Sequence, residues 1–234
     1  MDRDGHGRAA VTVDTMGLRA PIWHAHGLLF DLDGTLVDSA GAIEQVWSQA
    51  AHRLSLPPQE VLAVLAGRTA KDILSGFVKD QALIEHESRL IAAAQLKADG
   101  ITAVRGAASL LQALPVHRWA VVTAAPQAVA RARLRAAGLP KPQVLVAAED
   151  VQHGKPHPEG YLLAAQRLGR HPLDLVVLED AQVGIQAATA AGMRAIGVGG
   201  ATTGADAVVA DLAWFTEVGL EHDDRIRWRL EQPR

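Results

Sequence analysis

The stretch Leu28–Ser39, which reads LLFDLDGTLVDS, decides the fold of this 234-residue chain. It begins with an apolar run that is too short for a helix of its own and has the character of a strand. The run delivers Asp31 and Asp33 into a Gly-Thr turn. Because residues i and i+2 of a strand point to the same side, the two carboxylates are expected to converge where the strand ends. The stretch therefore predicts a reaction centre and not a piece of core.

Two carboxylates this close repel each other unless a cation or a shared proton relieves them, so a divalent metal is the natural partner. Asp31 is ionised at neutral pH and can attack an electrophilic phosphorus. Asp33 can protonate the leaving oxygen and then take a proton from the attacking water. Gly34 lets the backbone turn under a phosphate. The alternative is an ordinary Asp-rich turn, which the flanking strand and the following Thr-Leu-Val-Asp-Ser make the weaker interpretation.

Composition narrows the function classes. The net charge is −3 and no Lys/Arg cluster occurs, so the chain lacks the footprint of a nucleic-acid binder. With no cysteine there is no disulfide framework or thiolate metal site, which fits a cytoplasmic setting. No apolar run approaches the roughly 20 residues that span a bilayer. Residues 1–19 have no apolar signal region, and we expect them to be a disordered extension, with Met16 as an alternative start.

Beyond the opening stretch the chain changes character. Residues 40–99 show only helical spacing, which predicts helices over 42–54, 58–65, 70–77 and 84–97. From Gly106 onward, helical segments alternate with short apolar strands at 119–123, 144–147, 175–179, 195–198 and 207–211. This alternation predicts an α/β fold with a parallel sheet, and a helical domain inserted after its first strand. The charged tail 221–234 is expected to form a last helix or to fray.

Polar groups follow two of these strands, at the edge where open parallel sheets bind ligands. The Thr123 hydroxyl can donate to a phosphate oxygen beside the next backbone N–H groups. Glu179 and Asp180 can complete an oxygen cage for Mg²⁺ with Asp31 and the carbonyl of Asp33.

Lys155 stands between turn formers in Gly-Lys-Pro-His-Pro-Glu, where it can balance a phosphate and a carboxylate. His153 and His157 flank it. No third nitrogen or sulfur ligand is evident, so we expect these imidazoles to edge the site and not to bind metal.

These motifs, in this order and over nearly the whole chain, resemble those of the haloacid dehalogenase-like phosphohydrolases. The resemblance implies a Rossmann-like core, a helical C1 cap, Mg²⁺ and an aspartyl-phosphate intermediate. It assigns catalysis to Asp31, Asp33, Thr123 and Lys155, substrate phosphate contacts to Gly34, Thr35 and Ala124, and metal binding to Asp31, Asp33, Asp180 and Glu179, the last directly or in the outer shell. The chain departs from many relatives in having Ala124-Ala125-Pro126 after Thr123, and Ala181 where a Ser is frequent.

The resemblance also divides the chain. Residues 20–38 and 102–234 would form the core and 39–101 the cap, with hinges at 38–39 and about 99–104. The segment 67–71 would be the cap loop that faces the substrate. Arg68 and Lys71 are its candidate specificity residues, with a solvated surface role as the equal alternative.

Individual residues distinguish between several branches of the family. Dehalogenases and phosphonatases lack the second acidic residue, so Asp33 argues for phosphate transfer. The segments 100–106, 129–133 with 137–140, and 148–156 resemble the sugar-phosphatase and 2-deoxyglucose-6-phosphatase branch. β-Phosphoglucomutase-like isomerases carry a His where this chain has Ile43 and a cap Arg near Ala70. Phosphoglycolate phosphatase is a closer rival, and a phospho-ligand sensor is the non-enzymatic one.

The sequence thus predicts a Mg²⁺-dependent phosphatase of small sugar or polyol phosphates. Its partner is expected to be a small phosphorylated metabolite, with no nucleic acid and no membrane. We expect a cytoplasmic monomer.

Overall fold

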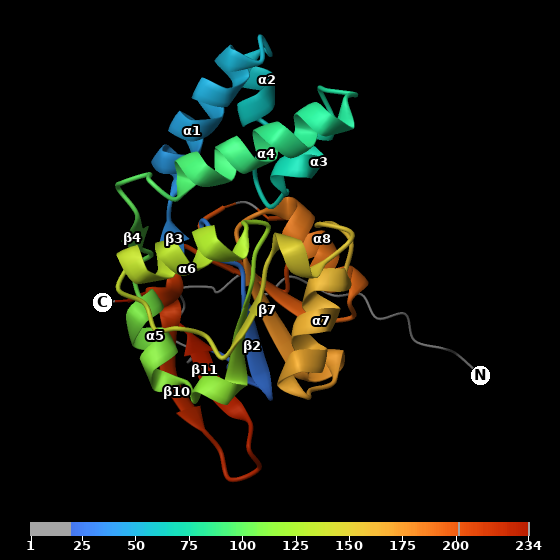
Figure 1. Ribbon diagram of the computed structural model, residues 1–234. Helices are drawn as coiled ribbons and strands as arrows, with labels where there is room; N and C mark the ends of the chain where they lie inside the picture. The colour runs from blue at the N-terminus through green and yellow to red at the C-terminus, as the bar shows by residue number, and fades with distance from the viewer. Residues whose placement is uncertain (1–19, 201, 234) are drawn as a thin grey trace, which may run out of the picture.

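The computed structural model describes residues 20–200 and 202–233, and the expected extension 1–19 with its alternative start at Met16 lies outside them. Six parallel strands form the central sheet in the order β6-β5-β2-β7-β8-β9 (Figure 1). They are, in that order, Val144–Val146, Trp119–Val122, Gly27–Phe30, Leu175–Glu179, Arg194–Val198 and Ala207–Val209. The α/β class and the five strands expected after Gly106 are confirmed, each strand to within two residues.

Both faces of the sheet are covered. Leu28 and Phe30 point to one face, where they join a core with α5 (Ala107–Ala113) and α6 (Gln127–Ala136). Leu29 points to the other face, toward α7 (Glu159–Leu168) and α8 (Gln182–Ala190). Because strand side chains alternate, a strand buried on both sides must be apolar throughout, and all four residues of β2 are buried.

Four helices stand together above the carboxyl ends of these strands (Figure 1). They are α1 (Ala40–Arg53), α2 (Pro58–Leu62), α3 (Ala70–Ser75) and α4 (Gln81–Gln95), and they share a small core of their own. The predicted helices of this region are confirmed to within three residues. Local chemistry sets where they begin: Pro58 occupies the first position of α2, and the Asp80 carboxylate accepts the N–H groups of Ala82 and Leu83 at 2.9 and 3.2 Å.

The two chain passages between these helices and the sheet lie side by side. β3 (Val37–Asp38) pairs antiparallel with β4 (Thr102–Ala103). Short 3₁₀ turns complete the description at Val116–Arg118, Ala148–Asp150, Pro172–Asp174 and Leu212–Trp214. Among the described residues, no helix combines the length and the apolarity that a bilayer crossing requires.

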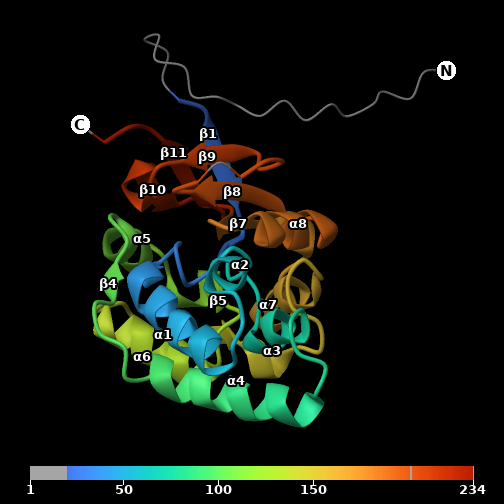
Figure 2. The same ribbon diagram turned by 90° about the horizontal axis from the view of Figure 1, so that it is seen from above.

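The prediction for the tail was wrong. Residues Ile226–Leu230 form β11, which pairs with β10 (Phe215–Leu220) and with β1 (Ile22–Ala25) in a second, antiparallel sheet. Figure 2 shows this sheet beside β8 and β9. Ile226, Trp228 and Leu230 are buried while the two arginines between them are partly exposed. That period of two is the signal of a half-buried strand, and it excludes a helix.

Candidate active site

The polar residues predicted for the site meet at one edge of the sheet. Asp31 directly follows β2, Thr123 follows β5, and Glu179 ends β7 with Asp180 next to it. These three strands are neighbours, and the Asp31 N–H donates to the Leu178 carbonyl at 2.9 Å. The carboxyl ends of these strands lie below α1–α4 (Figure 1). They therefore bring the four residues to one edge of the sheet.

Asp31 is a buried carboxylate in contact with a buried cation. Its Oδ1 accepts a short hydrogen bond from Lys155 Nζ. Burial raises the pKa of Asp31 well above its ordinary value, Lys155 opposes this, and Glu179 adds to it. Among the described residues Lys155 is the cation that contacts this buried carboxylate, and a metal ion bound beside Asp31 would stabilise its charge further.

Lys155 is held between two carboxylates. Its Nζ donates to Asp31 and to Glu179 Oε1. Burial alone would lower the pKa of Lys155, but the two carboxylates outweigh it and hold that pKa well above its usual range. The ammonium is therefore a fixed charge at the floor of the site.

Glu179 has its oxygens occupied by the protein. Besides Lys155, its Oε1 accepts from the Tyr161 hydroxyl at 3.0 Å, and its Oε2 accepts from the Ala181 N–H at 2.9 Å. Gly184 makes room for it, since a Cβ there would lie 1.7 Å from Glu179 Oε1. This arrangement favours an outer-shell role over direct metal ligation.

Asp180 is the less satisfied acidic group. Burial and the Glu179 charge raise the pKa of Asp180 to about 7. Its Oδ1 has a long contact, 3.4 Å, from the Thr35 hydroxyl. Ligand oxygens of Asp31, Glu179 and Asp180 lie within 4.8 Å of one another. Such a compact set of carboxylates, in part unneutralised, fits a hard divalent cation.

Gly34 is required beside Asp180. Its φ is +89°, and a Cβ at this position would lie 2.1 Å from Asp180 Oδ2. Neither the backbone conformation nor the available space admits a side chain.

A cavity of about 580 Å³ opens above these groups. Its floor comes from the sheet edge and includes Asp31, Asp33, Thr123 and Asp180, and Ala124 lines it as well. The Thr123 Oγ1 accepts the Ala125 N–H at 3.0 Å, which leaves the hydroxyl proton free to point elsewhere. A cavity of this size suits a small phosphorylated molecule.

The helices α1–α4 supply the roof of this cavity. Arg68 lies in it, together with Ile43, Trp47 and Ala70. Lys71 is not among the lining residues, because its Nζ pairs with Glu85 at 2.7 Å on the exposed surface. Its contact with substrate stays a prediction.

Comparison with known proteins decides the family. A model of the haloacid dehalogenase-like hydrolases matches residues 26–192. The chain belongs to this family. Hexitol phosphatase A of Escherichia coli is 48% identical over 177 residues, which is 74% of this chain and 82% of that protein. 2-Deoxyglucose-6-phosphate phosphatase 1 of Saccharomyces cerevisiae is 31% identical over 81% of this chain and 89% of its own length.

A solved structure agrees with this assignment. The crystal structure of a hydrolase from Pseudomonas syringae superposes with a TM-score of 0.70 at 27% identity, over 80% of this chain and 94% of that one. The likeness to the sugar-phosphatase branch of the haloacid dehalogenase-like hydrolases is thereby confirmed.

Two groups at the side chain of Asp33 were missed by sequence reasoning. Ser39 donates to Asp33 Oδ1 at 2.6 Å, and Arg133 Nη1 donates to Asp33 Oδ2 at 2.5 Å. Arg133 is 3% exposed and also lines the cavity. A signal was present, because Arg133 follows Val129 and Ala130 at helical spacing and so falls on the buried face of α6.

Two glycines allow the helical region above the cavity to contact the loops beneath it closely. A Cβ on Gly67 would lie 2.6 Å from a methyl of Val183 and 3.2 Å from Ala181. A Cβ on Gly154, next to Lys155, would lie 2.6 Å from Asp72 Oδ2. The segment 67–72 thus rests directly against the two loops that carry Lys155 and Asp180.

Proposed function

We propose that this haloacid dehalogenase-like hydrolase is a Mg²⁺-dependent phosphatase of small sugar or polyol phosphates that works through an aspartyl-phosphate. One observation carries the proposal. Buried Asp31, which accepts a hydrogen bond from Lys155, lies at the base of a cavity covered by α1–α4, and Arg133 holds Asp33 in the same cavity. The names of the relatives, a hexitol phosphatase and a deoxyglucose-6-phosphate phosphatase, support the substrate class.

The first half-reaction transfers the phosphoryl group to the protein. An Asp31 oxygen forms a bond to phosphorus while the bond from phosphorus to the substrate oxygen breaks. Lys155, the Thr123 hydroxyl and the backbone around Gly34, Thr35 and Ala124 would hold the phosphoryl oxygens. Asp33 gives its proton to the departing alkoxide, so the product leaves as a neutral hydroxyl compound.

The second half-reaction restores Asp31. Asp33 takes a proton from a water molecule, whose oxygen bonds to phosphorus as the bond to Asp31 breaks, and phosphate leaves. The Ser39 and Arg133 contacts fix the Asp33 carboxylate for both transfers. The roof formed by α1–α4 would keep other water away from the intermediate.

Asp31, Asp180 and the main-chain carbonyl of Asp33 would hold Mg²⁺, with Glu179 behind them. When bound, the ion supplies positive charge that offsets the carboxylates and the phosphoryl oxygens. The raised pKa values of Asp31 and Asp180 support this assignment, because burial and, to a smaller extent, the neighbouring carboxylates disfavour the ionised forms, and a bound cation would offset both effects.

The residues that cover the cavity also indicate which leaving group it can bind. Its polar side chains are Glu44, Gln59, Arg68 and Gln95, a mixture suited to hydroxyl groups. The charges of Glu44 and Arg68 are opposite, so these side chains offer no excess positive charge to an anionic leaving group such as glycolate. This favours neutral polyols and sugars over phosphoglycolate.

Hydrolysis is favoured over phosphomutase chemistry. β-Phosphoglucomutase-like relatives are expected to carry a His at the position of Ile43 and a cap Arg near that of Ala70, and both of these residues line the cavity with apolar surface. Neither can assist a second phosphoryl transfer to the sugar.

The remaining assignments belong to the same proposal. Residues 39–101 would act as a cap that opens and closes over the core formed by 20–38 and 102–234. The protein would work as a monomer in the cytoplasm.

The deciding experiment measures phosphate release from hexitol phosphates, hexose phosphates, glycerol phosphate, phosphoglycolate and β-glucose-1-phosphate. Each substrate is tested with Mg²⁺ and with EDTA, for the wild type and for Asp31→Asn. Metal-dependent release from the sugar or polyol esters, lost in the variant, supports the proposal. Preference for phosphoglycolate, or conversion of β-glucose-1-phosphate to the 6-phosphate without release, would replace it by one of the rival activities. No phosphate release from any of these esters would favour the phospho-ligand sensor.

A further inference from the structure

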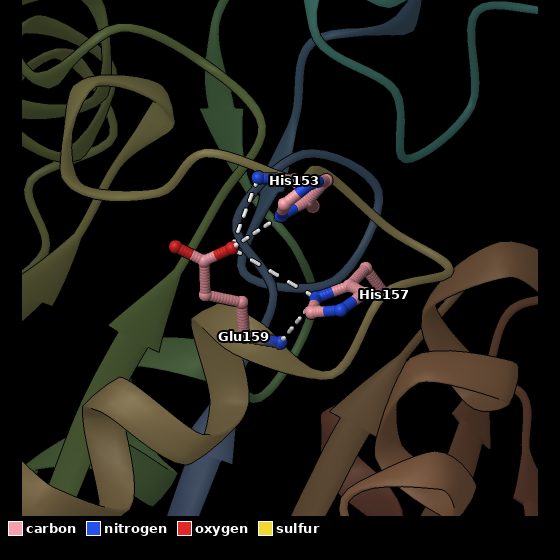
Figure 3. A group of neighbouring side chains, drawn as sticks. All are labelled: His153, His157 and Glu159. Atoms are coloured by element: carbon pink, nitrogen blue, oxygen red, sulfur yellow. Dashed lines mark hydrogen bonds and ion pairs between the residues drawn. The ribbon is translucent and has the colours of Figure 1, made fainter.

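Three side chains outside the carboxylate cage form a second cluster of metal-binding groups. His153 and His157 lie on the loop that precedes α7, Glu159 is the first residue of that helix, and the three side chains converge (Figure 3). The Glu159 Oε2 is 3.1 Å from His153 Nδ1 and 3.8 Å from His157 Nδ1. One ligand atom from each residue lies within 4.8 Å of the others.

These distances match a tetrahedral zinc site. Zinc bonds of about 2.0–2.1 Å to nitrogen and oxygen place neighbouring ligands roughly 3.4 Å apart. The two measured contacts lie on either side of that value. The imidazole rings also approach closely, with their centroids 4.7 Å apart.

The carboxylate is held in place by the loop. Glu159 Oε1 accepts the Gln152 N–H at 2.8 Å, and Oε2 accepts the His153 N–H at 3.0 Å. The His153 and His157 side chains are 63% and 51% exposed, so water can fill a fourth position. A bound ion would replace the 3.3 Å hydrogen bond that His157 Nδ1 accepts from the Glu159 N–H.

The donor set differs from that of the active site. Two imidazole nitrogens and one carboxylate oxygen suit Zn²⁺ and its neighbours among the transition metals, whereas Mg²⁺ prefers oxygen alone. The sequence expectation looked for a third nitrogen or sulfur, and the structure supplies an oxygen from Glu159 instead.

We propose that His153, His157 and Glu159 form a site for a single Zn²⁺-class ion, separate from the Mg²⁺ cage. Lys155 lies two residues from each histidine, and it shares with both of them the lining of a small cavity that also includes Thr123. An ion bound there would tie together the two sides of the loop that delivers Lys155 to Asp31. The site is inferred from its own ligands and does not depend on the proposed phosphatase activity.

Co²⁺ binding to the full chain, followed by absorption spectroscopy with Mg²⁺ in large excess, tests the site. The wild type is expected to show tetrahedral Co²⁺ bands that a single equivalent of Zn²⁺ displaces. Loss of an outer-shell partner alone weakens metal binding about 10–100-fold. His153→Ala and His157→Ala, which remove ligands, should therefore bind at least about tenfold more weakly.

Two control variants distinguish this site from others. His171 is exposed and accepts a backbone N–H two residues on, from Leu173 at 3.3 Å, as His157 does from Glu159. His171→Ala should bind as the wild type does, and so should Asp180→Asn, which alters only the carboxylate cage. Wild-type affinity in both ligand variants, or loss of binding in Asp180→Asn, would overturn the proposal.

Discussion

Arg133 Nη1 donates to Asp33 Oδ2 at 2.5 Å, across 100 residues of sequence. The guanidinium is almost fully buried, and its Nε has no hydrogen-bond partner among the described residues. A buried charge is stable only when it is paired, so the two side chains hold each other in place. Asp33, the proposed acid and base, is thus held in place by α6, the helix that follows β5.

Replacing Arg133 by Gln is expected to lower kcat for sugar phosphates by roughly tenfold to a thousandfold. General acid catalysis contributes about 10²–10⁴ to a rate, and a mispositioned Asp33 would lose part of that contribution. KM should change little. An ester with a good leaving group, p-nitrophenyl phosphate, needs no protonation, so its first turnover should be affected much less. Rapid-quench measurement of that first turnover separates the two substrates.

Two further variants make the Arg133 test specific. Arg133→Lys should recover part of the lost rate, since it restores the charge. Arg135→Gln, on the exposed side of the same helix, should behave as the wild type. An equal loss of rate on both leaving groups would mean that Arg133 supports the fold and not Asp33.

Asp31→Asn keeps the shape of the side chain and removes the nucleophilic charge. Turnover should be abolished, because the amide of Asn does not attack phosphorus as the Asp31 carboxylate would. The melting temperature should stay the same or rise, since the ionised form of Asp31 is disfavoured by burial and by the neighbouring carboxylates, and the neutral amide avoids both costs. Phosphate release and thermal unfolding check the two expectations. Asp38→Asn, an exposed carboxylate nearby, is the matched control, and sustained hydrolysis by Asp31→Asn would remove Asp31 from the nucleophile role.

Gly34→Ala should abolish Mg²⁺-dependent activity at sub-saturating metal, because the new Cβ displaces Asp180. Gly100 provides the control: its φ is +79°, yet a Cβ there meets no atom within 4 Å. Both variants should lose about 1–3 kcal/mol of unfolding free energy from backbone strain. Titration of activity with Mg²⁺ should show a large shift for Gly34→Ala alone. Identical metal curves for both variants would separate Asp180 from the metal.

Much of the site follows from short-range sequence signals. Asp31 and Glu179 come at the ends of short apolar runs, and the right-handed crossovers of parallel sheets bring such ends to one edge. β2 and β7 are in fact adjacent. The neighbourhood of these residues is therefore a consequence of fold class, which the pattern of strands and helices predicts.

The rest depends on partners that lie far away in the sequence. The alternation of apolar residues and arginines in Ile226–Leu230 favours a strand, but it does not show that β1 and β10 flank that strand, and β1 lies about 200 residues earlier. Its spacing from Val129 and Ala130 places Arg133 on the buried face of α6, but only the packing of that helix shows that its partner is Asp33. In both cases the decisive free energy comes from tertiary burial and not from the segment itself.

The Asp180 carboxyl makes the stability of the metal-free protein depend on pH. Its folded-state pKa is raised to about 7, so the folded state binds a proton more tightly than the unfolded chain does. The stabilisation this provides is complete below the unfolded pKa of about 4 and is lost as the pH rises to about 7. In EDTA, the unfolding free energy measured by urea denaturation should therefore fall across this range.

Mg²⁺ should largely remove this fall, because a bound cation stabilises the ionised carboxylates of the folded state. Asp31 contributes with the same sign, since burial raises its pKa as well. Asp180→Asn therefore isolates one group: the variant in EDTA should show a shallower decline than the wild type, and its stability should respond less to Mg²⁺. Parallel pH profiles for the two proteins in EDTA would show that Asp180 is already ionised without metal, and the proposed cage would then need another source of its affinity for the cation.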